Sequence, residues 1–400
     1  MRKGIIEGTL VVALFLLVMP ISTLSYADTW TCVSCLSYDD SWTEMNPVIA
    51  PSGRCDTPLV YDGESDVVIV FGGGRGSDVG PANDTWAYSY ESDTWYNKSP
   101  AVAPDIRVGH MMAYDSESKS VIMFSGALRK EDLPIGHVCY NETWEYNYSS
   151  NTWTNLEPAT VPTPRCYGAI AYDEESDRVI LFGGILEGTT VAADTWAYDY
   201  NSNTWENMNP ATRPSARFAA AMAYNSAVDK MILTGGTSDS VTGYKDTWSY
   251  DYDTNTWTNL NPSEPPPDSG MHMVYDAEDD VCIFFGEGTS TETKIYNYTS
   301  NSWSSLTHPT HPPWREQAAV AYDENSDRTI LFGGKTGSGS VNRLNDTWAF
   351  DYQAPPTTTT TTTTTPTTEP PPPIDPRILI AIAAGAVVLI LVIVIFARKQ

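Results

Sequence analysis

Five arginines recur at one position of a repeated sequence pattern. Each lies seven residues before a repeated tyrosine, and a sixth copy of the pattern has Asp268 at that place. The five are Arg54, Arg107, Arg165, Arg217 and Arg315. A planar guanidinium binds a carboxylate through two parallel hydrogen bonds, so a ring of such side chains predicts a site for an anionic ligand. The alternative is that each arginine satisfies backbone carbonyls of the surrounding loops.

Histidines are the other candidates for chemistry. His137, His272, His308 and His311 fall in segments expected to be loops or strand starts, and the last two form an H-x-x-H motif. A metal site needs neutral imidazoles that converge on one point, which a Pro-rich connection rarely allows. No Ser-His-Asp spacing indicates a nucleophile. The sequence therefore predicts neither a metal ion nor another cofactor.

The elements that position these residues come from one phrase repeated six times. Each copy has an apolar run ending in or near Gly-Gly, then a variable loop, then N-D-T-W-x-Y-x-Y, and finally N-T-W. The apolar runs are residues 68–73, 121–126, 179–184, 231–236, 282–287 and 329–334. Short apolar runs and alternating aromatic residues bounded by Gly, Asn and Asp predict strands.

The tryptophans confirm the number of copies. The first-position tryptophans are Trp86, Trp144, Trp196, Trp248 and Trp348, with Lys294 in the remaining slot. The second-position tryptophans are Trp95, Trp153, Trp205, Trp257 and Trp303, and the sixth slot falls in the threonine run. The segment around Trp42 resembles this missing strand. Units of about 50 residues with four strands are typical of propeller blades.

These residues resemble the kelch repeat, over residues 28–352. The resemblance implies an all-β, six-bladed kelch-type β-propeller of four-stranded blades, related in fold to the central domain of galactose oxidase. The strand around Trp42 is expected to complete the last blade and to hide its edge. A fragmentary seventh blade near Trp30 stays open as an alternative. Ser125, Glu287 and Lys294 depart from the pattern, which predicts distortion of the second and fifth blades.

Propeller connectivity also orients the arginines. The 4–1 and 2–3 loops share one face, and the 1–2 and 3–4 turns share the other. The chain leaves the last blade at Tyr352, on the face of the turns, so the loops are expected to point away from a membrane. The resemblance to kelch propellers that bind acidic peptides implies that the five arginines line a pocket on the loop face.

The two ends predict export and a membrane anchor. Residues 1–27 resemble a signal peptide, with two basic residues, an apolar run and small residues before the expected cleavage site. Residues 353–376 contain nine consecutive threonines and four consecutive prolines, which predicts an extended Thr/Pro stalk. Residues 377–397 contain an unbroken apolar run long enough to cross a bilayer. Residues 398–400, with two basic positions, are then cytoplasmic.

Composition excludes one class of partner. The formal net charge is −27, from 23 Lys and Arg against 50 Asp and Glu. Nucleic-acid binding requires a basic face that displaces counterions from phosphates, so a nucleic-acid partner is excluded. The aromatic content of 12% is too high for a disordered acidic chain.

An exported chain predicts disulfides and glycans. Cys139 is expected in the 2–3 loop of the second blade and Cys166 at the start of the first strand of the third blade, on the same face, so we expect a disulfide between them. Cys32 and Cys35 could form a small loop disulfide; Cys282 is expected to be a buried apolar residue. Six N-x-S/T sequons stand at Asn83, Asn97, Asn141, Asn147, Asn297 and Asn345. In several of them the asparagine could instead serve a turn.

Together these features predict a single-pass cell-surface protein that captures an extracellular protein or glycan. One alternative is a membrane-tethered enzyme acting on carbohydrate, like galactose oxidase. That chemistry needs a copper site of two tyrosines and two histidines, and no repeat-aligned set supplies it. Another alternative is a structural envelope protein without a ligand. Fold resemblance alone does not make an enzyme.

Overall fold

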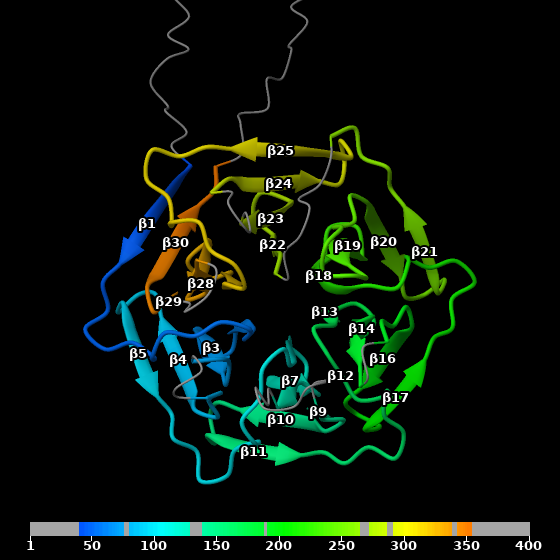
Figure 1. The fold of residues 1–400 in the computed structure, drawn as a ribbon, viewed down its shortest axis with the longest axis horizontal. Helices are drawn as coiled ribbons and strands as arrows, with labels where there is room; N and C mark the ends of the chain where they lie inside the picture. The colour runs from blue at the N-terminus through cyan, green and yellow to red at the C-terminus, as the bar shows by residue number, and fades with distance from the viewer. Residues whose placement is uncertain are drawn as a thin grey trace, which may run out of the picture. The chain divides into compact units, whose positions relative to one another are not determined.

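Five copies of the repeat each fold into four antiparallel strands, the sixth copy supplies three, and together with an N-terminal strand they form six blades around a central axis (Figure 1). This computed structural model describes residues 40–75, 80–128, 138–187, 190–264, 272–285, 291–337 and 342–353. The predicted six-bladed all-β propeller is therefore confirmed.

The first three blades follow the order of the sequence. Blade 1 contains β2 (Leu59–Asp62), β3 (Val67–Phe71), β4 (Thr85–Ser89) and β5 (Thr94–Asn97). Blade 2 contains β6 (Met111–Asp115), β7 (Ser120–Phe124), β10 (Thr143–Asn147) and β11 (Thr152–Asn155). Blade 3 contains β13 (Ala169–Asp173), β14 (Arg178–Phe182), β16 (Thr195–Asp199) and β17 (Thr204–Asn207).

The last three blades complete the ring. Blade 4 contains β18 (Phe218–Asn225), β19 (Lys230–Thr237), β20 (Thr247–Asp251) and β21 (Thr256–Asn259). Blade 5 contains β22 (Val274–Asp276), β23 (Val281–Phe285), β24 (Thr293–Asn297) and β25 (Ser302–Leu306). Blade 6 contains β26 (Ala319–Asp323), β27 (Arg328–Phe332), β30 (Thr347–Asp351) and β1 (Ser41–Met45). Two-residue ribbons form in several loops, including β8 (Ala127–Leu128) with β9 (Val138–Cys139), and β12 (Arg165–Cys166) with β15 (Ile185–Leu186).

The N-terminal strand closes the ring as predicted. β1 pairs antiparallel with β30, with Trp42 opposite Phe350 (Figure 1). The innermost strands β2, β6, β13, β18, β22 and β26 each contact the next, and β26 contacts β2. A seventh blade has no place in this closed circle, so that alternative is wrong.

The second-position tryptophans hold neighbouring blades together. Each of the six donates its indole N–H to the threonine hydroxyl of an N-D-T-W-type segment in the preceding blade, at 2.9–3.0 Å. Trp42 follows the same rule, since its Nε1 lies 2.9 Å from Thr293 Oγ1 in blade 5. An apolar cluster fills each of the six blade interfaces around these bonds. The repeated Trp and Thr are therefore interface residues.

The Gly-Gly pairs are also required between blades. Gly183 and Gly184 have φ values of +69° and +103°, in a region that side chains rarely adopt. A Cβ on Gly183 would lie 2.4 Å from the carbonyl oxygen of Arg217 in the next blade, and Gly184 donates its N–H to that oxygen. Ser125 in blade 2 takes the same left-handed conformation, with φ +61°, and blade 2 keeps four regular strands. The distortion predicted for blade 2 is not observed.

Both predicted terminal segments fall largely outside the described residues. The signal peptide, the stalk beyond Gln353, the membrane segment 377–397 and the tail 398–400 are among them. In the described part of the chain, no helix is long and apolar enough to cross a bilayer. The first and last described segments meet on the face of the turns, where the Gln353 N–H donates to Asp40 Oδ1 at 2.8 Å.

Candidate functional site

The five repeated arginines do not form an open binding surface. Their side chains are 0–1% exposed, and each donates to partners in its own blade. In blade 3, Arg165 Nη1 donates to the Gly183 carbonyl at 2.9 Å and to Asp194 Oδ1 at 2.7 Å. Its Nη2 donates to Asp194 Oδ2, and its Nε donates to the Thr163 carbonyl. With four donors satisfied internally, no bidentate fork remains for an anionic ligand.

Arg54, Arg217 and Arg315 repeat this arrangement, and Arg107 donates to a single oxygen of Glu142. The arginine–carboxylate pairs are Arg54–Asp84, Arg107–Glu142, Arg165–Asp194, Arg217–Asp246 and Arg315–Asp346. The predicted arginine site is therefore wrong, and the alternative that the arginines satisfy loop carbonyls is correct. Each guanidinium is used to fix the loops at the start of an inner strand.

Each carboxylate also holds the first-position tryptophan of its blade. Trp196 Nε1, for example, donates to Asp194 Oδ2 at 2.7 Å. Burial alone would raise the pKa of Asp194, but the hydrogen bond and charge of Arg165 outweigh it, and the net pKa is lowered. In blade 5, Asp268 and Lys294 replace the arginine and the tryptophan, and Lys294 pairs with Glu292 at 3.1 Å. At this position blade 5 therefore has a lysine–glutamate ion pair where the other blades have a hydrogen bond between the tryptophan and the carboxylate.

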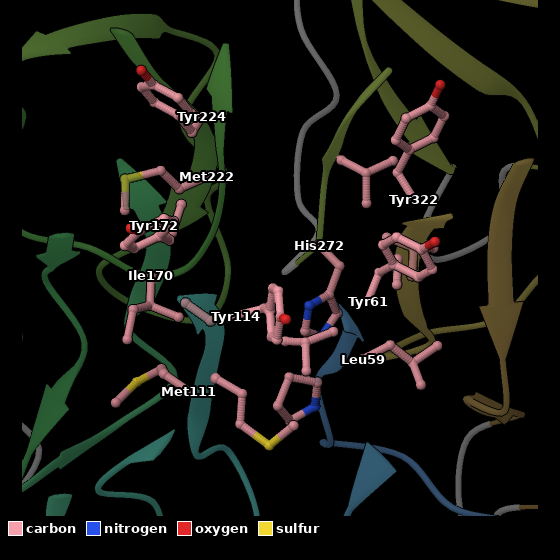
Figure 2. Close-up of a pocket in the computed structure, with 18 of the residues that line it drawn as sticks. Leu59, Tyr61, Met111, Tyr114, Ile170, Tyr172, Met222, Tyr224, His272 and Tyr322 are labelled. Atoms are coloured by element: carbon pink, nitrogen blue, oxygen red, sulfur yellow. The ribbon is translucent and has the colours of Figure 1, made fainter. Parts of the chain in front are cut away.

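The inner strands of all six blades instead line a cavity along the axis. Its volume is about 540 Å³. Figure 2 shows side chains from several blades converging on it, among them Leu59, Met111, Ile170 and Met222. A concave space that combines apolar side chains with convergent polar groups is a usual form of ligand site.

Six tyrosines line the end of the cavity nearest the 1–2 turns. They are Tyr61, Tyr114, Tyr172, Tyr224, Tyr275 and Tyr322. Five of the six donate their hydroxyl proton to an aspartate five residues later, at 2.9–3.0 Å. The exception is Tyr114, whose oxygen accepts the Glu64 N–H at 3.3 Å. Burial raises the pKa of each of these tyrosines, so the rings stay uncharged at neutral pH.

Three glutamates lie at the rim of this end. Glu64, Glu174 and Glu324 line the cavity, and all three are exposed. Glu174 and Glu324 come from blades 3 and 6, which lie on opposite sides of the axis (Figure 1). Desolvation raises the pKa of Glu324, and the charges of Glu174 and Asp323 raise it further. Glu64 forms an ion pair with the exposed Lys119 at 2.9 Å, whereas no ion pair within the described residues neutralises Glu174 or Glu324.

Two histidines and an aspartate line the other end of the cavity. His110 is 3% exposed and Asp56 is 2% exposed. Neither nitrogen of His110, nor Nε2 of His272, nor Oδ1 of Asp56 forms a hydrogen bond of normal geometry within the described residues. Burial lowers the pKa of His110 to about 3 and that of His272 to about 4, and the nearby Arg107 charge contributes at His110. Both imidazoles are therefore neutral at pH 7.

Comparison with known proteins identifies the repeat. Residues 59–286, more than half of the chain, match the family model described as the KLHDC2/KLHL20/DRC7 Kelch-repeats domain. The chain belongs to the kelch-repeat family. Its kelch propeller also resembles the structure titled "Structure of YjhT", with a TM-score of 0.59 and 13% identity over 75% of this chain and 95% of that one. At that identity the likeness concerns the fold alone.

The curated relatives are diverse and mostly longer. The flagellar outer-arm dynein alpha chain of Chlamydomonas reinhardtii is 25% identical, over 74% of this chain and 7% of its own length. The F-box/kelch-repeat protein At1g51550 of Arabidopsis thaliana is 28% identical, over 50% of this chain and 44% of its own. Kelch domain-containing protein 10 of Xenopus tropicalis is 25% identical, over 63% of this chain and 64% of its own length. The chain thus spans less than two thirds of each of these relatives.

The remaining histidines serve the kelch propeller itself. His308 Nδ1 lies 2.9 Å from the carbonyl oxygen of Asp40, beside the closing strand, and His311 Nδ1 lies 2.9 Å from the Pro312 carbonyl. In the part of the chain that the structure describes, no group of three His, Cys, Asp or Glu side chains is arranged to hold a metal ion. His137 lies outside the described residues.

The predicted disulfide partners lie side by side. The sulfur atoms of Cys139 and Cys166 are 3.8 Å apart, as two buried thiols in a small apolar cluster. The disulfide stays a prediction. Cys282 is completely buried between blades 4 and 5, as expected for an apolar role. Cys32 and Cys35 lie outside the described residues.

The six sequons divide into two groups by exposure. Asn83, Asn97, Asn141 and Asn345 are exposed, while Asn147 and Asn297 are half-buried. Asn147 Oδ1 accepts the Ser150 N–H at 3.0 Å, and Asn297 Oδ1 accepts the Ser300 N–H at 2.8 Å. These two asparagines therefore stabilise turns, and glycosylation at any of the six stays a prediction.

Sequence reasoning missed the axial site although its residues were in view. The six tyrosines mark the repeat, and they open on the cavity because they lie on the innermost strand of every blade. The position of the tyrosines, just before the apolar run of each copy, could have predicted that they line the axis. His110 and Asp56 carried no comparable signal, because no other copy repeats them.

Proposed function

We propose that this chain is a cell-surface kelch propeller that binds an extracellular ligand in its axial cavity. The observation that carries the proposal is the cavity of about 540 Å³ lined by all six inner strands. Its size falls within the range of small-molecule and side-chain sites, and its inner end holds polar groups that lack a partner within the described residues. The extracellular placement rests on the signal-like segment 1–27, the stalk 353–376 and the apolar segment 377–397.

Exposed apolar residues on the loop face favour a protein or glycan partner there as well. Val48, Val102 and Val241 are 100%, 57% and 87% exposed, and they lie in 4–1 and 2–3 loops. These are the loops expected to point away from the membrane. Loops held by a rigid ring of strands are the usual location of binding residues.

The experiment is a peptide and glycan array probed with the chain truncated after Gln353. Binding is expected to saturate and to be lost in Ile170→Trp, because Ile170 lines the cavity and a larger ring would fill it (Figure 2). The control is Val241→Trp, which adds the same ring to an exposed loop and is expected to bind normally. If Ile170→Trp folds and binds every ligand as the parent does, the cavity is not the site.

A further inference from the structure

The axial cavity is lined by acidic side chains without basic ones. Glu64, Glu174 and Glu324 stand at the rim and Asp56 at the inner end, while the described residues that line the cavity include no lysine or arginine. Lys119, outside the lining, pairs with Glu64, so Glu174 and Glu324 are the rim carboxylates without an ion pair in the described residues. The five repeated arginines do not change this sign, because each is buried against a carboxylate of its own blade. In a chain of net charge −27, a cavity with low-dielectric walls concentrates the negative potential and attracts cations.

The six tyrosines near the 1–2 turns, called the tyrosine collar from here on, also favour a cation. Six rings surround the path just inside the rim, and their hydroxyl protons point to aspartates in five of the six cases. Aromatic rings attract ammonium and guanidinium groups through their electron-rich faces. Each ring also packs against an apolar cluster between blades, and an anionic group at this position would meet the repulsive charge of the rim glutamates.

The middle of the cavity is apolar. Leu59, Met111, Ile170, Met222 and Val274 line it between the tyrosines and the histidines (Figure 2 labels the first four). Aliphatic and thioether side chains favour burial of methylene groups, at roughly 0.8 kcal/mol for each one. A ligand that reaches both polar ends must therefore carry an alkyl segment between them.

The inner end offers acceptors in need of a donor. The nitrogens of His110 and the Oδ1 atom of Asp56 are buried and without a hydrogen bond of normal geometry in the described residues. A carboxylate oxygen and the one unprotonated nitrogen of a neutral imidazole accept from N–H groups, while the other ring nitrogen is itself a donor. Buried polar groups are nearly always satisfied, so these atoms indicate a missing donor. This observation is independent of the acidic rim and points to the same ligand chemistry.

We propose that the axial cavity binds a linear alkylammonium ligand, with cationic nitrogen at the rim glutamates and tyrosine collar, a methylene chain in the apolar middle, and a second N–H donor at Asp56 and His110. The proposal rests on the proposed function and names the ligand class for that site. Its chemistry has two natural sources, a free polyamine and a lysine side chain of a protein.

The test is calorimetric titration of the full-length chain in detergent micelles with four probes. 1,6-Diaminohexane has cationic nitrogens at both ends of a six-carbon methylene chain, hexylamine has one, N-acetyl-lysine methylamide presents a lysine side chain, and hexanoate carries the opposite charge. 1,6-Diaminohexane is expected to bind more tightly than hexylamine, and hexanoate not at all. If the lysine derivative binds at least as tightly as 1,6-diaminohexane, the source is a protein side chain.

Paired variants locate the contact. Replacing both Glu174 and Glu324 with Gln is expected to weaken 1,6-diaminohexane binding about tenfold, from the usual strength of two exposed ion pairs. Asp56→Asn, which keeps the shape of the residue and its tolerance of a positive φ, is expected to weaken it as well. The control is Glu175→Gln, which removes the same charge from the same turn as Glu174 but outside the cavity lining.

The outcomes separate this inference from the proposed function. The alkylammonium ligand would be overturned if hexanoate bound as tightly as the amines, or if Glu175→Gln weakened 1,6-diaminohexane binding as much as the double variant. An array ligand that is excluded by Ile170→Trp while no amine binds would leave the cavity as a site and refute its cationic chemistry. If nothing binds in either experiment, the proposed function fails with the inference.

Discussion

The closing strand offers the sharpest test of the architecture. Trp42 is 2% exposed, stacks on Phe350 at 4.9 Å and donates to Thr293 of blade 5. Trp42→Ala removes a buried ring together with a hydrogen bond that crosses to the neighbouring blade. Large-to-small changes of this kind cost about 3–5 kcal/mol of the free energy of unfolding. For a domain of this size we expect the melting temperature to fall by roughly 10 °C.

A double-mutant cycle isolates the hydrogen bond. Trp42→Phe removes the indole N–H, and Thr293→Val removes the hydroxyl with little change in volume. Their coupling energy is expected to be about 1 kcal/mol, the net value of a typical hydrogen bond. The matched control is Trp205→Phe with Thr143→Val, which removes a 2.9 Å bond between blades 2 and 3, away from the chain end.

The assay is denaturant unfolding followed by far-ultraviolet circular dichroism, which does not depend on the mutated tryptophan. Coupling of about 1 kcal/mol in the control pair and none in the Trp42 pair would mean that β1 does not dock in solution. Unaltered melting of Trp42→Ala would refute ring closure by the N-terminal strand, and with it the closed axial cavity.

Three further predictions concern buried groups. Arg165→Ala should cost about 3 kcal/mol of stability, since it leaves Asp194 without its partner, and thermal melting measures this loss. Burial raises the pKa of Asp276 to about 6, above its usual value, so the free energy of unfolding should fall as pH rises from 4 to 6. Asp276→Asn should remove about 1–2 kcal/mol of that fall, a figure reduced for solvent screening, in unfolding titrations at both pH values. Oxidation should join Cys139 to Cys166, and non-reducing peptide mapping would reveal two separate thiols if the pairing is wrong.

The fold was predictable because the same local sequence pattern occurs in all six copies of the repeat. Short apolar strands, Gly-Gly pairs and spaced tryptophans each predict part of a blade, and the displaced Trp42 predicts which blade is shared between the two chain ends. The structure adds the reason for the repeated threonine. Its hydroxyl accepts the indole N–H from the next blade, which a pattern within one copy does not reveal.

The prediction of an arginine site was wrong for a physical reason, and part of that reason can be read from the sequence. The carboxylate that neutralises Arg165 lies 29 residues later, beyond the variable loop. The copy that lacks the arginine, at Asp268, also lacks the tryptophan, at Lys294, which is the pattern expected if the arginine and tryptophan share one acidic partner. The sequence correctly predicted that the arginines precede the innermost strands. It did not predict the direction in which their guanidinium groups point.

By itself the sequence determined the class of fold, the number of blades, the shared blade and the expectation of export, because these depend on local patterns and on segment composition. Only the tertiary structure decided where charge is available. Folding buries five guanidiniums against carboxylates distant in the chain and brings Asp56, His110, Glu174 and Glu324 to one cavity. A site is a set of side chains close in space, and closeness across blades depends on ring closure, which no single repeat encodes.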